Sequence, residues 1–460
     1  MGADTPTRTL FRGPYRRTAW SVCALVSLYA FEEMGVAAAL PTAVADVGGL
    51  SYFGWVFTGF LATSVVGMAT SAYLCDRFGP RVPIVACVTI FVVGLVVAGT
   101  ATAMAPLVAG RVIQGLSGGG LMTATYVVVG THVPAELRTR MFAAIAFCWV
   151  IPGVVGPTVS GAVTEHVSWR WIFLGLAPVA VAAAAMLVPA LSHQPSGPVG
   201  TAAPAGAPPR PSRILYAVAA AVGVSTVQVG AGRPSPLSAA AIVGGVALLG
   251  FALRALLPPG TARLRSPVGV PIALRGITAG ALFGVESVIP LMLVTQHGLG
   301  PLEASIPLAC AGLPCALAAW WASRPGAGDR LDRQVRLARR GFVLLGIADA
   351  SFIWLSQPAS TEWLMGPAWV LAGFGIGLVV PTMNALALER TADTDRSANA
   401  SSLQIADTTA SCVTTGFAGV LVTYATRGSL GFTTAFVVIG ASMTAIALVG
   451  AAAAGRLRPA

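Results

Sequence analysis

The sequence has no lysine, only four histidines and few charged residues of either sign. All 28 basic residues are therefore arginines, 17 residues are acidic, and charged residues make up 10% of the 460-residue chain. Because soluble proteins carry about a quarter charged residues, this composition excludes an ordinary soluble domain. Hydrophobic residues make up 55% of the chain, which predicts an all-α protein that crosses a membrane many times. The net charge of +11 requires no nucleic-acid partner, because arginines gather beside the cytoplasmic ends of membrane spans.

The sequence also lacks the residue clusters that metal sites and enzymes need. Its seven cysteines are mostly scattered through apolar stretches, without a CxxC pair or a zinc-type spacing. We find no nucleophile–base constellation and no phosphate-binding loop. The sequence therefore predicts neither an enzyme nor a metal protein. It also predicts no cleavable signal peptide, because the apolar run behind the basic N-terminal tail is too long and contains acids.

Apolar stretches of about 20 residues are long enough to cross a membrane as helices. We predict fourteen such helices, near residues 18–40, 52–74, 83–101, 106–130, 141–163, 170–190, 213–231, 237–257, 270–295, 303–323, 341–357, 363–388, 400–425 and 431–454. With the N-terminus inside, nearly all arginines fall in cytoplasmic segments or at their helix ends; Arg170, Arg233 and Arg427 fall outside and Arg111 is embedded. This distribution satisfies the positive-inside rule and places both termini in the cytoplasm.

The predicted helices form two bundles of six with a hairpin inserted between them. In chain order these are a cytoplasmic basic tail (1–17), an N-terminal six-helix bundle (18–190), a flexible cytoplasmic linker rich in Pro, Gly, Ala and Ser (191–212), an inserted transmembrane hairpin (213–257), a C-terminal six-helix bundle (258–455) and a cytoplasmic tail (456–460). The first helix of the hairpin is short; if it does not span, the count is twelve and both termini still lie inside. Two six-helix bundles are expected where two halves rock about a central site.

Six ionisable residues lie inside these apolar stretches, where a charge costs about 3 kcal/mol even on translocon-based scales. They are Glu32, Glu33, Arg111, Glu286, Asp349 and Asp407. Such residues persist mainly where they face a bundle interior and handle protons, ions or substrate. Because adjacent helix residues point about 100° apart, Glu32 and Glu33 are not expected to face the same wall. Depth places Glu286 near the midplane and Asp407 nearer the cytoplasmic end, where it is either a substrate contact or a latch.

Five short motifs follow one another along the predicted helices. They are Phe31-Glu32-(x)8-Pro41 on the first, Asp76-Arg77-x-Gly79-x-Arg81 after the second, Arg111-x-x-Gln114-Gly115 on the fourth, Gly156-Pro157-x-x-x-Gly161 on the fifth and Trp169-Arg170-Trp171-Ile172-Phe173 opening the sixth. Together they resemble the signature motifs of the major facilitator superfamily, especially its fourteen-helix drug:proton antiporter branch. The sequence departs from the family pattern at Ala72, Ser160 and Leu176, where the family has two glycines and an asparagine.

The resemblance implies a role for each motif. The loop that latches the cytoplasmic ends of the two bundles in the family comprises Asp76, Arg77, Gly79 and Arg81 here. The antiporter motif, which permits a bend and close helix contact, comprises Gly156, Pro157 and Gly161. Glu32 takes the position of the family's aspartate, which makes it the expected proton site. For the loop motif, ordinary topology-setting charge is the alternative reading.

Arg111 takes the position of a family arginine that is associated with proton coupling. Arginine does not give up its proton at useful pH, so it is a poor proton carrier. We expect it to provide a fixed positive charge that favours the ionised form of a nearby acid. The alternative is a structural arginine bonded to backbone carbonyls.

The sequence as a whole predicts a proton-driven exporter of small cationic or amphiphilic compounds in the plasma membrane. We expect proton coupling at Glu32, Glu33, Arg111 and Glu286. We expect substrate contacts at Glu33, Glu286, Gln114, Trp149, Asn384 and Asp407. The expected partners are the substrate, protons and membrane lipids, the expected state is a monomer, and the proton gradient stands in place of a cofactor. A dedicated exporter of a host metabolite or lipid is one alternative, and a transport-inactive membrane sensor is another.

Overall fold

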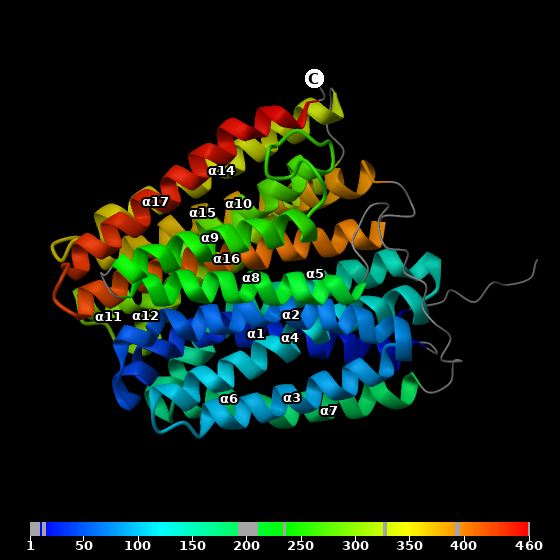
Figure 1. Ribbon diagram of the computed structural model, residues 1–460, viewed down its shortest axis with the longest axis horizontal. Coiled ribbons are helices and arrows are strands. Elements are labelled where there is room, and N and C mark those ends of the chain that lie inside the picture. Colours follow the sequence, from blue (N-terminus) through cyan, green and yellow to red (C-terminus); the bar gives the residue numbers. More distant parts are fainter. Residues whose placement is uncertain are drawn as a thin grey trace, which may run out of the picture.

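Every regular element in the described part of the chain is helical (Figure 1). The computed structural model describes residues 10–11, 15–191, 210–232, 236–324, 329–391 and 396–458. Most of the predicted basic tail (1–17) and linker (191–212) lies outside these residues, as does the end of the predicted tail 456–460. Within them, thirteen helical segments are long and apolar enough to cross a membrane. The predicted all-α, multi-pass architecture is therefore confirmed.

The N-terminal bundle follows the predicted order of helices. It consists of α1 (Arg16–Val47), α2 (Phe53–Phe78), α3 (Arg81–Gly99), α4 (Met104–His132), α5 (Ala135–His166), α6 (Arg170–Leu174) and α7 (Leu176–Ala190), with a 3-10 turn, η1 (Leu50–Tyr52), before α2. α4 packs against α2 and α3, and α1 packs against α5 and α7. Gly48 and Gly49 follow α1 with φ of 73° and 90°, a backbone region in which a side chain would be strained. These glycines therefore allow the tight turn from α1 into η1.

The C-terminal bundle follows the inserted hairpin. It consists of α10 (Gly269–Glu286), α11 (Ile289–His297), α12 (Pro301–Cys310), α13 (Gly312–Ser323), α14 (Arg330–Leu355), α15 (Met365–Glu389), α16 (Arg396–Thr426) and α17 (Phe432–Ala453), with 3-10 turns η2 (Glu362–Leu364) and η4 (Ala454–Leu457). α14 begins at Arg330 rather than at residue 341, because the Asp329 carboxylate caps it by accepting a hydrogen bond from the N–H of Leu331 (3.0 Å). Its arginine-rich first turns keep α14 out of the thirteen apolar segments, although it is 26 residues long.

Three of the predicted helices, near residues 170–190, 270–295 and 303–323, are broken in the structure. The breaks lie at Gly175 between α6 and α7, at residues 287–288 between α10 and α11, and at Ala311 between α12 and α13. A proline follows each break within three residues: Pro178, Pro290 and Pro314. Proline has no N–H to donate and is accommodated best in the first turn of a helix. Each predicted span is still present as one apolar segment, Arg170–Ala190, Gly269–His297 and Pro301–Ser323. The interruption inside each segment could not be predicted from apolar length, because length does not show where a new first turn begins.

The two bundles meet most closely at the end of the molecule that carries the α1–η1 turn. There, a Cβ added at Gly54 of α2 would lie 2.7 Å from the Cα of Gly419 of α16. Beside it, the Thr423 hydroxyl donates a hydrogen bond to the Ser51 carbonyl across the bundle boundary (2.8 Å). The second boundary contact joins α5 to α12. Backbone approach this close requires residues without side chains, so the two bundles are closed against each other at this end.

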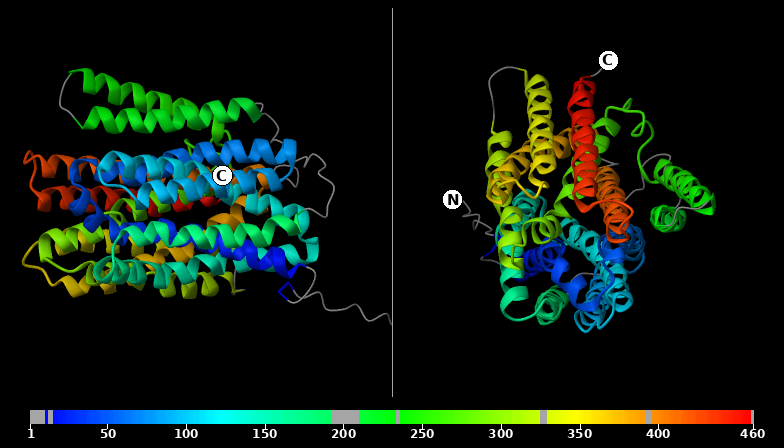
Figure 2. Two further views of the ribbon diagram at one scale, coloured as in Figure 1. Left: turned by 90° about the horizontal axis from the view of Figure 1, so that it is seen from below. Right: turned by 90° about the vertical axis from the view of Figure 1, so that its left-hand side faces the viewer.

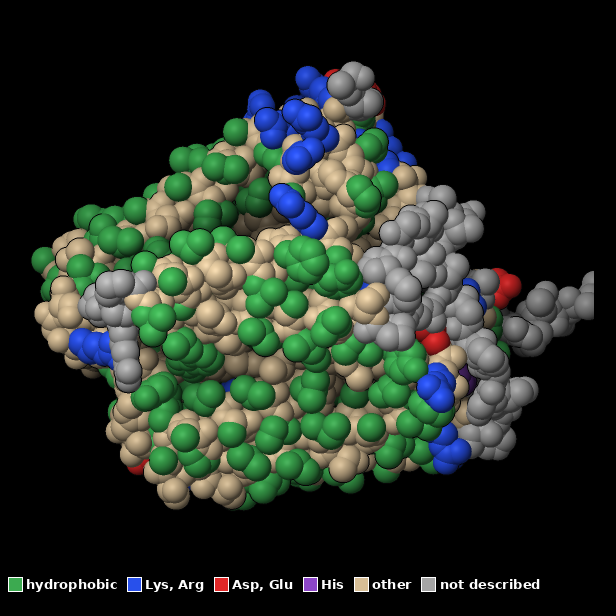
Figure 3. All heavy atoms as spheres, viewed as in Figure 1, with side chains coloured by type: hydrophobic (Ala, Val, Ile, Leu, Met, Phe, Trp, Pro, Cys, Tyr) green, Lys and Arg blue, Asp and Glu red, His purple; other side chains and the backbone are tan. Residues whose placement is uncertain are grey.

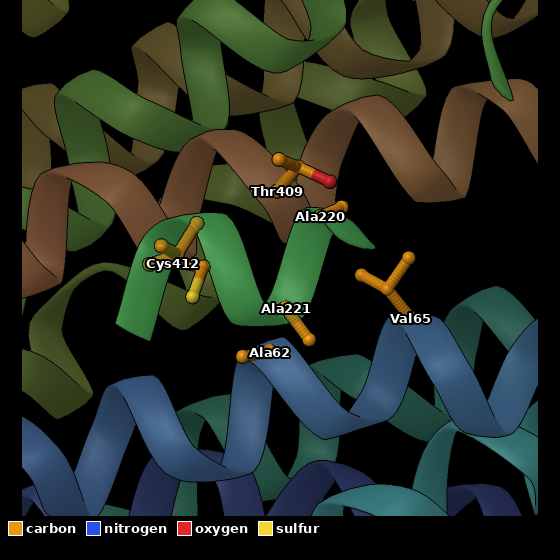
Figure 4. A pocket seen from close by; sticks show the side chains of 7 residues that line it. Ala62, Val65, Ala220, Ala221, Thr409 and Cys412 are labelled. Carbon is orange, nitrogen blue, oxygen red and sulfur yellow. The ribbon is translucent and has the colours of Figure 1, made fainter. Parts of the chain in front are cut away.

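The inserted hairpin consists of α8 (Arg210–Ala231) and α9 (Pro236–Leu256), which lie together along the outside of the bundles (Figure 2). α8 contacts both α2 and α16, one helix from each bundle. The buried Gln228 of α8 accepts a hydrogen bond from the hydroxyl of Thr58 of α2 at 2.5 Å. Small side chains surround a void of about 10 Å³ between these three helices: Ala62, Val65, Ala220, Ala221, Val224, Thr409 and Cys412 (Figure 4). The hairpin is thus attached by close packing and a buried hydrogen bond at the boundary between the bundles.

Candidate functional site

Glu32 of α1 and Arg111 of α4 form a buried ion pair inside the N-terminal bundle. Their side chains are 0% and 1% exposed. Arg111 also donates from Nε to the carbonyl of Val56 (3.0 Å) and from Nη1 to the side-chain oxygen of Gln114 (2.9 Å), and its guanidinium lies 4.1 Å from the centre of the Phe60 ring. A buried charge is tolerated when its partner and its remaining hydrogen bonds are supplied. The arrangement therefore gives Arg111 both an acid and a backbone carbonyl as partners.

Glu33 points away from this pair and toward the C-terminal bundle. It is partly exposed, and it interacts electrostatically with Asp407, Glu286 and Arg275. The hydroxyl of Tyr29, one helical turn earlier, lies next to its carboxylate. Glu32 and Glu33 thus face different neighbours, as their 100° separation on a helix predicts.

Asp407 of α16 pairs with Arg275 of α10 at 2.9 Å, so the acid lies within the C-terminal bundle. The side chains of Arg275 and Asp407 are 18% and 13% exposed. Asp407 Oδ2 accepts from the guanidinium, whereas its buried Oδ1 has no hydrogen-bond partner among the described residues. Tyr126 of α4, which is 37% exposed, interacts electrostatically with both members of the pair. The pair therefore faces the N-terminal bundle.

Arg275 is the functional candidate that the sequence analysis missed. In the arginine distribution it counts among the arginines of the cytoplasmic segments and their helix ends, since the predicted helix begins near residue 270. In the structure α10 begins at Gly269, so that Arg275 stands in the second turn and turns inward to Asp407. The signal that could have found it is Asp407 itself, because an acid at that depth requires a counter-charge.

Glu286 is the last residue of α10 and lies at the break before α11. It is partly exposed and interacts electrostatically with Glu33 of the opposite bundle. The break does not leave the last carbonyls of α10 without partners: the N–H of Ser287 donates to the Phe283 carbonyl (3.2 Å) and the N–H of Val288 donates to the Val285 carbonyl (3.0 Å). The carboxylate of Glu286 is therefore the group at this break that favours a cation or a proton donor.

The other predicted substrate contacts are placed differently. Trp149 of α5 is partly exposed and stacks edge-on against Tyr29, with ring centres 5.9 Å apart. Asn384 of α15 is also partly exposed. Gln114 is fully buried and its side-chain oxygen accepts a hydrogen bond from Arg111, so the structure places it with the ion pair rather than beside Glu33.

Asp349 of α14 is 0% exposed, and neither of its carboxylate oxygens has a hydrogen-bond partner among the described residues.

The loop motif after α2 makes mainly local contacts through its arginines. Arg77 donates to the hydroxyl of Tyr73 one turn earlier (3.0 Å) and lies over the Phe78 ring, while Arg81 is exposed at the start of α3. Gly79 has a φ of 73°, which explains why the tight turn between α2 and α3 needs a glycine. Asp76 also interacts with its surroundings. The latching role of this loop stays a prediction.

The antiporter motif lies within α5, at the contact with the other bundle. Gly156 and Pro157 are both buried, and α5 continues through them without a break. A Cβ added at Gly161 would lie 2.8 Å from the carbonyl oxygen of Pro301 in α12. Four residues further on, Glu165 accepts a hydrogen bond from the N–H of Leu302 (3.1 Å). α5 and α12 are therefore in close contact at Gly161, and this contact joins the two bundles.

Comparison with known proteins identifies what this arrangement is similar to. The family described as Major Facilitator Superfamily matches residues 22–412. A protein of Mycobacterium tuberculosis named "probable multidrug-efflux transporter" is 29% identical over 443 residues, which cover 91% of this chain and 90% of the relative. An "efflux pump" of Gibberella moniliformis is 27% identical over 393 residues, covering 78% of this chain and 66% of the relative.

Solved structures of transporters share the fold. A peptide transporter bound to sulfate superimposes with a TM-score of 0.70 at 14% identity, covering 98% of this chain and 96% of that chain. The human organic anion transporter MFSD10 superimposes with a TM-score of 0.63 at 13% identity, covering 96% of this chain and 100% of that chain. At these identities the likeness establishes the fold alone.

Proposed function

The chain belongs to the major facilitator superfamily, and on that premise we propose that it exports small cationic or amphiphilic compounds in exchange for protons. The observation that carries the proposal is the electrostatic cluster of Glu33, Glu286, Asp407 and Arg275, contributed by both bundles. Relatives named for efflux, one of them aligned over 91% of this chain, support export as the direction.

The charge of the cluster favours a cation. Three acids face one arginine, so the cluster is negative when all four groups are ionised. Two like charges about 8 Å apart repel each other by about 2 kcal/mol at an effective dielectric constant of about 20. Either a cationic substrate or a proton relieves that repulsion at the same carboxylates. Competition between the two for one set of acids is the physical basis of the proposed exchange.

The proposed cycle begins from the conformation described above, which is closed at the end that carries the α1–η1 turn. With the N-terminus inside, that end faces outward. The substrate enters from the cytoplasm and is held by Glu33, Glu286 and Oδ1 of Asp407, which has no hydrogen-bond partner among the described residues. The bundles then rock, protons from outside displace the substrate, and the protonated carrier returns. Each proton that moves down a potential of 100 mV supplies about 2.3 kcal/mol for this work.

Glu32 and Arg111 form the second part of the proposed mechanism. The positive charge of Arg111 favours the ionised form of Glu32 and opposes the effect of burial, which favours the neutral acid. When Glu32 takes up a proton, Arg111 keeps its bonds to the Val56 carbonyl and to Gln114. The guanidinium therefore keeps two of its hydrogen bonds while the acid changes its charge. A fixed positive charge beside a titrating acid is the role that we propose for this motif.

For the topology we propose fourteen spans with both termini in the cytoplasm of a plasma-membrane protein. The thirteen apolar segments together with α14 support that number. The hairpin supports it too, because α8 and α9 are 22 and 21 residues long and α8 lies beside α2. The arginine distribution supports the orientation.

Transport into everted membrane vesicles tests the proposal. A lipophilic cation should accumulate only when a proton gradient is present, and a protonophore should abolish the accumulation. Glu33→Gln should raise the KM for the cation about tenfold, a change of about 1.4 kcal/mol, and leave a neutral substrate unaffected. Glu136→Gln, at an exposed acid in the first turn of α5, is the matched control.

Each other outcome points to a different function. Accumulation without a gradient contradicts proton coupling. Transport of one metabolite and of nothing else in a panel of toxic cations and neutral compounds indicates a dedicated exporter. A folded, membrane-inserted protein that transports no compound in the panel indicates a sensor.

A further inference from the structure

A groove on the surface of the C-terminal bundle has an apolar floor and a basic rim. It encloses about 490 Å³ between α13, α14 and α15. Its lining residues are Trp321, Arg339, Arg340, Val343, Leu344, Phe374 and Leu378. It lies apart from Glu33, Glu286 and Asp407, none of which contributes to its walls. The proposed export function therefore leaves it without a role.

We propose that this groove binds one anionic phospholipid of the cytoplasmic leaflet, with the headgroup phosphate at Arg339 and Arg340 and an acyl chain along Val343 and Phe374. Both arginines are exposed, and the structure gives neither an acidic partner among the described residues. Arginine binds phosphate with paired N–H donors. Arg339 and Arg340 both line this groove, so both can supply positive charge to one phosphodiester.

The apolar part of the groove matches an acyl chain. Trp321 is 46% exposed, Val343 is 42% exposed and Phe374 is 36% exposed. Exposed apolar side chains in a membrane-spanning helix face lipid tails, and a recess between helices holds one chain more tightly than a flat surface does. Phospholipid is the occupant of the right chemistry that is always present at this surface.

The depth of the groove places its rim at the level of lipid headgroups. Arg339 and Arg340 stand where the arginine-rich first turns of α14 give way to its apolar run. On the neighbouring helix, Trp321 lies near the end of α13, and tryptophan is enriched at the boundary between membrane and water. Arg333 donates to the carbonyl of Trp321 (3.3 Å), which joins the end of α13 to α14 and shapes the rim. Figure 3 shows that arginine side chains gather at the same end of the molecule as the C-terminus.

The orientation of the chain determines which leaflet the groove faces, and therefore which class of lipid it meets. Under the proposed topology the first turns of α14 are cytoplasmic, and anionic lipids attract basic residues on that side of the membrane. The inference rests on this topology but not on the export of any compound. Lipid binding and transport can therefore fail independently in experiment.

Native mass spectrometry of the purified protein, titrated with dioleoyl phosphatidylglycerol, tests the proposal. The double variant R339Q/R340Q should bind this lipid about tenfold more weakly than the parent, while binding of phosphatidylcholine is unchanged. The matched control is R263Q/R265Q, which removes two exposed arginines from the cytoplasmic loop before α10 and should bind within twofold of the parent. Val343→Trp fills the groove without changing charge, and it should weaken binding of the same lipid.

The controls decide between a built site and diffuse attraction. Equal weakening in R339Q/R340Q and R263Q/R265Q overturns the proposal, since it indicates general attraction to a basic surface. Unchanged binding in R339Q/R340Q overturns it as well. All three variants alter surface side chains, and a melting temperature equal to that of the parent confirms that each is folded. If Val343→Trp melts early, Phe374→Ala replaces it, because it shortens the apolar wall without adding volume.

Discussion

Replacing Arg275 with glutamine removes the guanidinium that pairs with Asp407 between α10 and α16 at 2.9 Å. Because the two side chains are only 18% and 13% exposed, the carboxylate that remains is mostly shielded from water. Breaking a fully buried pair costs about 3–5 kcal/mol, and partial exposure lowers the expected cost here to about 2 kcal/mol. In R275Q/D407N the charge is removed together with its partner. The double variant should therefore recover most of the stability that R275Q loses.

Thermal unfolding of the detergent-solubilised protein measures this cycle. A loss of about 2 kcal/mol lowers the melting temperature by roughly 2–4 °C in a chain of this size. The pair Arg458–Asp332 is the matched control: it has the same separation, 2.9 Å, but its side chains are 60% and 42% exposed. An exposed pair typically contributes about 0.5 kcal/mol, so R458Q should melt within about 1 °C of the parent. Equal melting of R275Q and R458Q, or no recovery in R275Q/D407N, refutes the reasoning.

Three further predictions follow from the same contacts. Glu32→Gln should abolish proton-coupled efflux in everted vesicles but leave membrane insertion intact, because glutamine beside Arg111 cannot take up and release a proton. Unchanged efflux would place the proton site at Glu33 or Glu286 instead. Gly419→Val should increase the labelling of the protein's thiols by a reagent added from outside, since a side chain at this position meets the backbone of Gly54. Gly244→Val serves as the control, because a Cβ at Gly244 meets open space. Equal labelling of the two variants would contradict the closed outer contact. A reporter fused within residues 230–234 should lie outside the cytoplasm, and a cytoplasmic signal returns the count of spans to twelve.

The embedded charges show how far sequence reasoning reaches. Glu32 and Arg111 are both deep in apolar stretches, so their burial and their need for counter-charges could be predicted. Their pairing with each other could not, because Glu33 lies at almost the same depth and only the rotation of α1 decides which acid faces α4. Arg275 was missed for a related reason, since its inward direction depends on how α10 packs against α16.

The helix boundaries show a second limit. The long apolar helices α2, α4 and α16 lie near their predicted positions, because hydrophobic length is a property of composition. The pairs α6–α7, α10–α11 and α12–α13 were each predicted as one span. Their prolines do not reveal the interruptions, because α1 and α5 also contain prolines and yet remain continuous. Whether a proline kinks a helix or begins a new one depends on neighbouring helices that satisfy the freed backbone groups.

By itself the sequence determined the class of this protein: a many-helix membrane protein with the motifs of one transporter family. Composition and local spacing suffice for that, because burial in a bilayer acts on every residue of a span in the same way. Only the tertiary structure decided how the charges are shared, with Glu32 and Arg111 in a closed pair and Glu33, Glu286, Asp407 and Arg275 set against one another across the bundles. That division depends on helix rotation and on contacts between residues far apart in the chain, 79 and 132 positions in the two ion pairs, which no local pattern encodes.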